Sequence, residues 1–377
     1  MHTIRTDDGK SESIRIVDVD VHLHEQPKLM APYCDMPWRK SLEMMEEELG
    51  RYNDIPGFST GPRLDPPFPG GMAARKVLTA SQMREELDAI GVDIGILFPD
   101  HLLTLALLPN RDYAAAVARA YNAWMLDCWL RDDNGLKGAL VAAPQDPVDA
   151  ARQIERYAKE RNIVCVYLPC AGVHPLYGDR WYDPMYQAAQ DAGIPVVLHS
   201  VAVVHPVFPF NLHEFDTAIA RHTLAHPFSM IANMVSIITT GVPARFPKVK
   251  FAFEEAGISW VPFVMWRLDK EYTEQRRQIP ALKDRPSTYI RQFHFATQPI
   301  EEPDDSRDLV ALMRTFGGED NVMFASDWPH HDFDHPSKVL QLPLPAESKK
   351  KIMGENATRF FGLEAAERAG IVNRHGE

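Results

Sequence analysis

Residues 136–200 read LKGALVAAPQDPVDAARQIERYAKERNIVCVYLPCAGVHPLYGDRWYDPMYQAAQDAGIPVVLHS. Three apolar runs in this stretch, LKGALVAAP, IVCVYLP and IPVVLHS, have the length of buried strands. The segments between them, DPVDAARQIERYAKE and DPMYQAAQDAG, have apolar residues at helical spacing. Because parallel strands need a long crossover between them, usually a helix, the stretch predicts consecutive β–α units around a parallel sheet.

The same alternation continues on both sides of this stretch. Before it we expect a helix around 81–90, a strand at 92–99 and a helix at 111–130. After it the pattern predicts helices at 214–241, 258–272, 305–317 and 346–363, with strands at 249–255, 292–299 and 321–327. Together with a strand near residue 20, this gives about eight strands, each followed by a helix. We therefore predict an α/β fold, a closed (β/α)₈ TIM barrel that forms one domain over residues 1–377.

Residues 26–77 interrupt this pattern directly after the first strand. The segment is rich in Pro and Gly, contains the run PPFPGG and has little helical or strand periodicity. Long segments of this kind inside compact domains are usually binding loops or lids. We predict a loop or lid inserted into the barrel.

Composition excludes several classes of protein. A formal charge of −12 disfavours a nucleic-acid partner, which requires a basic surface. No run approaches the ~18 apolar residues of a membrane span, and the N-terminus lacks the apolar core of a signal peptide. The four cysteines have no CxxC spacing, and the motifs GxGxxG, GxxxxGK[ST] and GxSxG are absent. We expect a soluble cytoplasmic protein without a membrane partner, a dinucleotide site, a P-loop or a serine nucleophile.

The segment DVDVHLH at residues 18–24 alternates polar and apolar residues with the period of a strand. Asp18, Asp20, His22 and His24 should therefore point to one side of that strand. Such a group of carboxylates and imidazoles is costly to bury unless a cation binds to it. The segment predicts a divalent metal.

Other polar residues stand at the ends of later predicted strands: His199, Glu254, Glu255 and Asp327. Strand ends converge at the catalytic face of a β/α barrel. Imidazoles and carboxylates without thiolates are typical of a catalytic zinc, manganese or iron site. Since neighbouring residues of a strand point to opposite faces, we expect only one of the two glutamates, Glu255, to face the barrel axis.

Four segments carry a family resemblance: VDVDVHLHE at 17–25, PVVLHS at 195–200, SDWPHHD at 326–332 and IMGENATRFFGL at 352–363. They resemble the amidohydrolase-related family that includes aminocarboxymuconate-semialdehyde decarboxylase. The resemblance implies that His22, His24, His199 and Asp327 bind one divalent metal. The chain departs from the family at FAFEEAGISW, residues 251–260, where many members have a His followed by glycines. Glu255 stands in that position, as a base or as a further metal ligand together with Asp20.

Several histidines lie near these segments. We predict His331 to be catalytic together with Glu255 and Asp327, and His335 to lie in a solvated polar loop in which Asp332 or Asp334 caps a turn. The sequence leaves His330 open as a metal ligand or the neighbour of one.

Residues for a substrate pocket come from the predicted loops. The expected lining consists of Phe208, Phe210, His222 and Trp328, which suits an apolar or aromatic substrate. His222 and His226 lie four residues apart and could contact substrate or pack in the core, and His174 is a further loop candidate.

These features predict a metal-dependent hydrolase or non-oxidative decarboxylase that acts on a small organic, aromatic or carboxylated substrate. The expected cofactor is zinc, manganese or iron. One alternative is a dinuclear nonheme Fe/Fe or Fe/Mn oxygenase on the same fold, because the carboxylates could hold two ions. A second alternative is a noncatalytic metal-binding subunit. The family resemblance also implies a homodimer or a hetero-oligomer with a related barrel.

Overall fold

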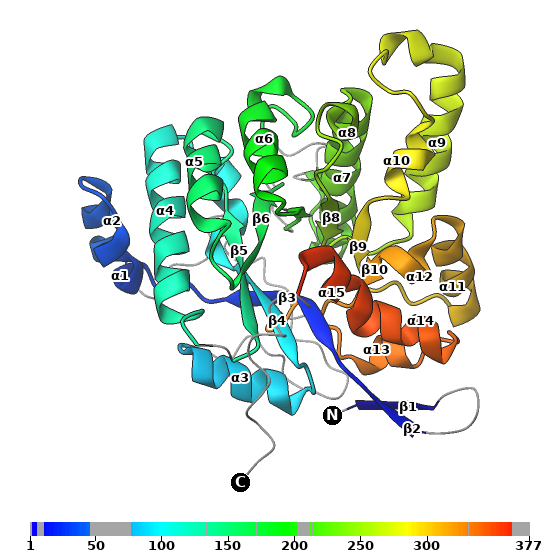
Figure 1. The fold of residues 1–377 in the computed structure, drawn as a ribbon, viewed down its shortest axis with the longest axis horizontal. Coiled ribbons are helices and arrows are strands. Elements are labelled where there is room, and N and C mark those ends of the chain that lie inside the picture. The colour runs from blue at the N-terminus through cyan, green and yellow to red at the C-terminus, as the bar shows by residue number, and fades with distance from the viewer. Residues whose placement is uncertain are drawn as a thin grey trace.

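The computed structural model describes residues 2–5, 11–45, 77–132, 134–170, 172–201, 212, 214–330 and 332–363. Its centre is an eight-stranded sheet in the order β10-β9-β8-β7-β6-β5-β4-β3, with every neighbouring pair parallel (Figure 1). The strands are β3 (Val17–Leu23), β4 (Ile94–Pro99), β5 (Leu136–Val141), β6 (Ile163–Pro169), β7 (Val196–His199), β8 (Phe251–Glu254), β9 (His294–Ala296) and β10 (Val322–Met323). The order follows the sequence, as repeated β–α units require.

The sheet closes on itself between β3 and the chain that follows β10. The backbone N–H of Val19 donates to the carbonyl of Phe324 (3.0 Å), and that of His22 donates to the carbonyl of Trp328 (2.7 Å). An isolated parallel bridge between Val21 and Trp328 continues this pairing. The predicted (β/α)₈ barrel is therefore confirmed.

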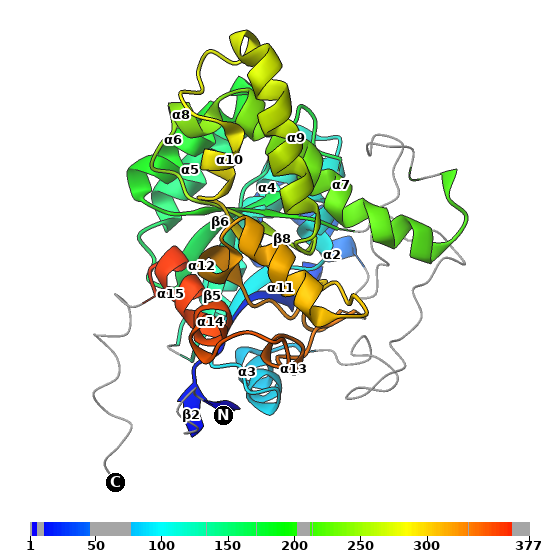
Figure 2. The ribbon, with the colours of Figure 1, turned by 90° about the vertical axis from the view of Figure 1, so that its right-hand side faces the viewer.

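Helices surround the barrel (Figure 2). The longer ones are α3 (Ala80–Ala89), α4 (Arg111–Cys128), α5 (Pro147–Tyr157), α6 (Asp183–Ala192), α7 (Ala218–Thr239), α9 (Trp260–Gln275) and α11 (Ser306–Thr315). The shorter ones are α8 (Val242–Arg245), α10 (Pro286–Ile290), α12 (Gly318–Asn321), α13 (Ser337–Leu340), α14 (Ala346–Lys350) and α15 (Asn356–Phe361), with the 3₁₀ segments η4 (Arg180–Tyr182) and η6 (Arg276–Gln278) and a π-helical turn, η7 (Lys351–Glu355).

Local sequence explains where several helices begin. The side chains of Asn110 and Asp146 accept hydrogen bonds from backbone N–H groups in the first turns of α4 and α5, which satisfies donors that a helix start leaves without partners. A proline at the start of α5 and of α6 fits the same position because it has no N–H to satisfy.

Helix α9 exposes two of its aromatic residues. Phe263 and Trp266 are 64% and 58% exposed. The helix buries Val261, Val264 and Met265 instead. Helical spacing places Phe263 and Trp266 on one face, but it does not identify which face of α9 contacts the barrel.

The first part of the 26–77 segment is helical. It contains α1 (Pro27–Met30), the 3₁₀ turn η1 (Ala31–Tyr33) and α2 (Trp38–Met44). Residues 46–76 lie outside the described residues, so the loop or lid stays a prediction. A two-stranded antiparallel sheet of β1 (His2–Arg5) and β2 (Ser11–Ile14) precedes the barrel, and the sequence analysis had not predicted it. Among the helices described, none is long and apolar enough to cross a membrane.

Candidate metal centre

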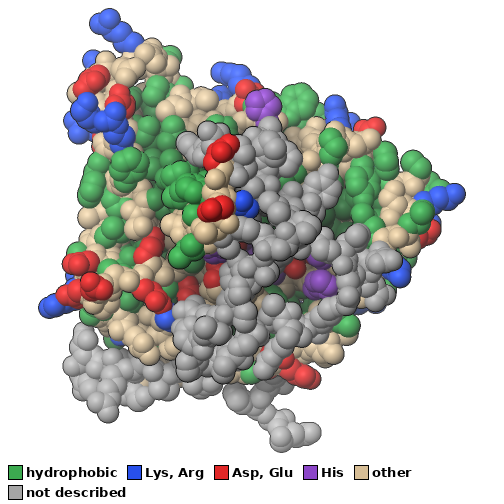
Figure 3. Space-filling view, turned by 180° about the vertical axis from the view of Figure 1, so that it is seen from behind, with side chains coloured by type: hydrophobic (Ala, Val, Ile, Leu, Met, Phe, Trp, Pro, Cys, Tyr) green, Lys and Arg blue, Asp and Glu red, His purple; other side chains and the backbone are tan. Residues whose placement is uncertain are grey.

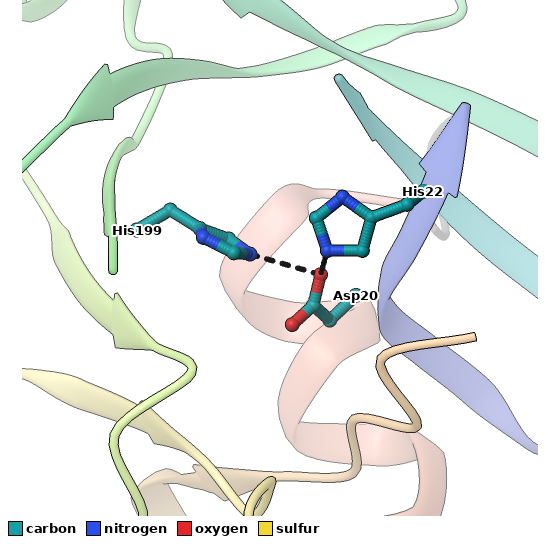
Figure 4. Close-up of side chains that lie close together, drawn as sticks. All are labelled: Asp20, His22 and His199. Carbon is teal, nitrogen blue, oxygen red and sulfur yellow. Dashed lines mark hydrogen bonds and ion pairs between the residues drawn. The ribbon is translucent and has the colours of Figure 1, made fainter. Parts of the chain in front are cut away.

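Asp20, His22 and His199 meet inside the barrel (Figure 4). Asp20 and His22 lie on β3, and His199 ends β7. The Oδ1 atom of Asp20 is 3.1 Å from Nε2 of His22 and 3.0 Å from Nε2 of His199. All three side chains are buried. The two-residue period of β3 thus brings a carboxylate and an imidazole to the same side of the strand.

Asp327 joins this group from the chain that follows β10. Its Oδ1 atom is 3.0 Å from Nε2 of His22, and the amide of Gln298 donates to its Oδ2 atom (3.0 Å). The backbone of Asp327 has a φ of +61°, a conformation that costs a non-glycine residue about 1–3 kcal/mol. The barrel closure therefore holds Asp327 in a strained position from which its carboxylate reaches His22.

His24 does not join the same group. Strand β3 ends at Leu23, and the Nδ1 atom of His24 is 3.7 Å from Oδ2 of Asp100. Its ring lies 5.1 Å from that of His101. Because the strand ends before His24, the alternation that turns Asp20 and His22 toward His199 does not extend to it. Asp20, which the sequence also placed among the metal ligands, is the residue of β3 that joins His22 in this group.

Glu254 and Glu255 are both buried. The Oε2 atom of Glu255 is 3.3 Å from Nδ1 of His199 and 3.6 Å from Nδ1 of His226. Strand β8 ends at Glu254, and Glu255 has a φ of +58°. Strand alternation therefore stops between the two glutamates, and it does not assign only one of them to the site.

The imidazoles and carboxylates of the site shift one another's pKa values. Burial alone would raise the pKa of Asp20, but the charges of His199 and His22 hold it well below its usual range. Burial opposes the charged form of His22 and His199, yet Asp20 raises the pKa of both. Burial raises the pKa of Glu254. Burial would do the same for Glu255, but His226 lowers its pKa well below the usual value.

The donor chemistry fits a divalent metal. Among the described residues, several buried polar atoms of this site make no hydrogen bond of regular geometry, although three of them lie at ion-pair distance from a neighbour: Asp20 Oδ2, His22 Nε2, Asp327 Oδ1, Glu255 Oε2 and both carboxylate oxygens of Glu254. Buried polar groups normally have partners. Donor atoms of Asp20, His22 and His199 lie within 4.8 Å of one another, as do those of His22, Asp327 and His330. A cation would satisfy these atoms and balance the buried carboxylates.

His330 lies directly beside this centre, within the two roles that the sequence left open for it. Its ring stacks on that of His22 with centroids 4.1 Å apart, and its Nδ1 atom is 2.6 Å from Oδ1 of Asp327. The backbone N–H of His330 donates to the carbonyl of Asp327 (2.8 Å), so a tight turn brings the ring back over the site. The signal in the sequence was the three-residue spacing from Asp327, which is typical of such a turn.

The remaining predicted residues take varied positions. The Nε2 atom of His222 lies 3.4 Å from Oδ2 of Asp332, and its ring is 4.6 Å from that of His226. Trp328 is fully buried, so it belongs to the wall where the barrel closes. His335 is half-buried, and its Nδ1 atom accepts from the backbone N–H of Ser337 (3.2 Å).

Three predicted residues, Phe208, Phe210 and His331, lie outside the described residues. His174 is exposed and belongs to none of the metal-type groups found among the described residues. On one face of the molecule, histidine and acidic side chains lie together near the centre (Figure 3).

Comparison with known proteins identifies the family. The model of the family described as Amidohydrolase matches residues 19–363. The gamma-resorcylate decarboxylase of Rhizobium sp. (strain MTP-10005) is 25% identical over 297 residues, which are 74% of this chain and 86% of that protein. The corresponding enzyme of Polaromonas sp. (strain JS666 / ATCC BAA-500) is 23% identical over 66% of this chain and 77% of its own length.

Solved structures support the same fold. The 5-carboxyvanillate decarboxylase of Sphingomonas paucimobilis superposes with a TM-score of 0.68 at 22% identity, covering 93% of this chain and 99% of that one. The dihydroxybenzoic acid decarboxylase of Polaromonas sp. JS666, solved with manganese and 2-nitroresorcinol, has a TM-score of 0.67 at 19% identity and covers 95% and 100% of the two chains. The family resemblance expected from the sequence is confirmed, and the chain belongs to the amidohydrolase family of enzymes.

Proposed function

We propose that this protein is a metal-dependent, non-oxidative decarboxylase of a small aromatic carboxylate. The observation that supports this most strongly is the buried group of Asp20, His22, His199 and Asp327 at the carboxyl end of the barrel. Relatives that align with 74% and 66% of the chain are decarboxylases of an aromatic acid. Of the reactions expected from the sequence, decarboxylation agrees with both observations.

The proposed metal ligands are Asp20, His22, His199 and Asp327, and His24 is not among them. Zinc, manganese and iron all suit these donors, and two decarboxylases of similar fold were solved with manganese. Held by these residues, the cation would supply Lewis-acid stabilisation of negative charge on the substrate oxygens.

The protein must also deliver a proton. Non-oxidative decarboxylation replaces the C–C bond to the carboxylate with a C–H bond, so one proton reaches the ring carbon for each carbon dioxide released. His330 and Asp327 form a pair 2.6 Å apart that can hold this proton. Burial raises the pKa of Asp327, although the neighbouring His330 opposes this shift. We assign proton delivery to this pair.

Glu255 has a second role in this proposal. Its Oε2 atom is 3.3 Å from Nδ1 of His199, which also lies 2.7 Å from the carbonyl oxygen of Ser200, while Nε2 of His199 contacts Asp20. A carboxylate or a backbone carbonyl behind a metal-binding imidazole fixes the orientation and tautomer of its ring. Glu255 would therefore orient His199 together with the carbonyl of Ser200. The catalytic role of His331 stays a prediction.

The decisive experiment measures metal content and product under anaerobic conditions. The protein is purified without added metal, analysed for metal content and incubated with 2,6-dihydroxybenzoate and 5-carboxyvanillate. We expect release of carbon dioxide and the decarboxylated phenol, with loss of both turnover and metal in Asp327→Ala. The matched control is Asp191→Ala, which removes an exposed carboxylate. Turnover that requires oxygen, or hydrolysis of an amide with no carbon dioxide released, would contradict the proposal.

One observation favours the oxygenase as a second candidate. Glu254 and Glu255 add two buried carboxylates beside His199 and Asp20, and carboxylate-rich donor sets suit iron and manganese. That candidate requires two metal ions bound at this centre. It also requires that the protein consumes oxygen, and that Glu255→Gln consumes it more slowly than the wild type. The predicted homodimer or hetero-oligomer can be measured by light scattering of the purified chain.

A further inference from the structure

A second group of potential metal ligands lies beside the first. His24 follows β3, while Asp100 and His101 follow β4, the neighbouring strand. The Nδ1 atom of His24 is 3.7 Å from Oδ2 of Asp100, and the rings of His24 and His101 are 5.1 Å apart. One donor atom from each residue lies within 4.8 Å of the other two. We propose that His24, Asp100 and His101 form a second, separate binding site for a zinc-like divalent ion.

The backbone of this second site is held in place by a buried carboxylate. Glu25, only 2% exposed, accepts hydrogen bonds from the backbone N–H groups of Asp100 (3.0 Å), His101 (2.9 Å) and Leu102 (3.0 Å). These bonds fix the start of the 3₁₀ helix η3 (His101–Leu107). Because Glu25 adjoins His24 in sequence, it fixes all three ligand positions relative to one another. Such preorganisation is what a metal site requires of its supporting residues.

The donor set and spacing suit zinc. Zinc bonds to imidazole nitrogen and carboxylate oxygen are about 2.0–2.2 Å long, so neighbouring ligand atoms in a tetrahedral site stand about 3.3–3.6 Å apart. The 3.7 Å between His24 and Asp100 is close to that spacing, and one donor atom of His101 lies within 4.8 Å of both. Two imidazoles and one carboxylate leave a coordination position open. The side chains of His24 and Asp100 are 28% and 16% exposed, so an ion can enter from solvent.

The second site is connected to the first through one histidine. The Oδ1 atom of Asp100 is 3.2 Å from Nε2 of His330, and Nδ1 of the same ring is 2.6 Å from Asp327. No residue belongs to both proposed ligand sets, so the two sites differ from a dinuclear centre with shared carboxylates. An ion on Asp100 would alter the hydrogen bonding of His330 and thereby the affinity of Asp327 for the first metal. By thermodynamic linkage, a metal at the first site must change the affinity of the second site by the same factor.

The experiment is equilibrium dialysis of chelator-treated protein against zinc, with elemental analysis of the bound metal. We expect two zinc ions per wild-type chain, one in His101→Ala and one in His24→Ala. The matched control is His174→Ala, an exposed histidine elsewhere, which should keep two. Circular dichroism confirms that each variant is folded, and the two variants at separate positions guard against failure of either one to fold.

A primary-site variant separates this inference from the proposed function. His199→Ala should bind one zinc, at the second site, and its remaining zinc should disappear in the double variant with His101→Ala. If His101→Ala and His24→Ala both keep two zinc ions, or if the wild type binds one, the second site is refuted. If His199→Ala still binds two zinc ions, His199 is not a ligand of the first metal and the proposed first centre is refuted, whereas the second site is not. None of these results depends on enzymatic activity.

Discussion

Asp18 allows a quantitative test of the barrel closure. Its Oδ1 atom accepts from the backbone N–H groups of Ser326 (2.9 Å) and Asp20 (3.2 Å), and its Oδ2 atom is 2.5 Å from Oγ of Ser326. Burial raises its pKa from 3.8 to about 8. At pH 7 the folded protein therefore holds Asp18 as a neutral acid, whereas the unfolded chain has lost that proton.

The sign of the resulting pH dependence follows from proton counting. Between pH 3.8 and about 8 the unfolded state binds one proton fewer at Asp18, so this group makes the free energy of unfolding fall as the pH rises. At about 1.4 kcal/mol per pH unit, the loss by pH 7 reaches about 4 kcal/mol. In Asp18→Asn the side chain is always neutral: its Oδ1 atom can accept from the same two backbone N–H groups, and its Nδ2 atom would donate to Oγ of Ser326, the reverse of the direction in the wild type. We expect the variant to be more stable than the wild type at pH 7 by up to about 4 kcal/mol.

The assay is urea unfolding of chelator-treated protein at several values between pH 5 and pH 8, followed by tryptophan fluorescence. As the pH rises over this range, the free energy of unfolding of the wild type should fall more steeply than that of Asp18→Asn. The difference in slope should approach the value for one proton, about 1.4 kcal/mol per pH unit. Asp191→Asn, an exposed site, controls for the loss of one negative charge. A variant that is less stable than the wild type at pH 7, with an unchanged pH slope, would show that Asp18 is ionised in the folded barrel and would refute the reasoning.

Three further predictions concern the centre and the core. His22→Ala should lose the first metal and activity while circular dichroism stays unchanged; full metal retention would remove His22 from the ligand set. Glu255→Gln should keep the metal and lower kcat about 10–100-fold, because the ring of His199 loses its carboxylate partner; an unchanged kcat would contradict that role. Asn122→Ala should destabilise the protein by about 2–4 kcal/mol in urea, since it leaves the backbone N–H and carbonyl of Val141 unpaired. A loss below about 0.5 kcal/mol would mean that other groups satisfy Val141.

The barrel could be predicted because its strands are short apolar runs between amphipathic helices. The run IVCVYLP coincides with β6, Ile163–Pro169, and every residue of that strand is buried. The inward direction of Asp20 and His22 also follows from the two-residue period of β3. The same period does not say which two residues act as ligands, however. In DVDVHLH, both the pair Asp20 and His22 and the pair His22 and His24 have the two-residue spacing of neighbours on one face of a strand. Only the end of β3 at Leu23 separates the two solutions.

Other parts of the site depend on backbone geometry that a hydrophobic pattern does not encode. The positive φ of Glu255 ends the alternation that should have separated it from Glu254. The turn from Asp327 to His330 places one of two adjacent histidines over His22, and neither histidine carries a periodic signal. Tertiary contacts set the direction of side chains beyond the end of a strand. The sequence therefore indicates the segment that follows Asp327, but not which of its two adjacent histidines faces the centre.

The proposed metal centre lies where the barrel closes. The last strand, β10, is only two residues long, Val322–Met323, and the chain beyond it completes the barrel by pairing with β3. Asp327 donates its backbone N–H to the carbonyl of Asp20 (3.0 Å) within this pairing, and its carboxylate meets His22. A metal bound there would join the first and last strands, so its binding free energy would add to the stability of the closed barrel. Removal of the metal should therefore weaken first the contact between β3 and residues 324–328.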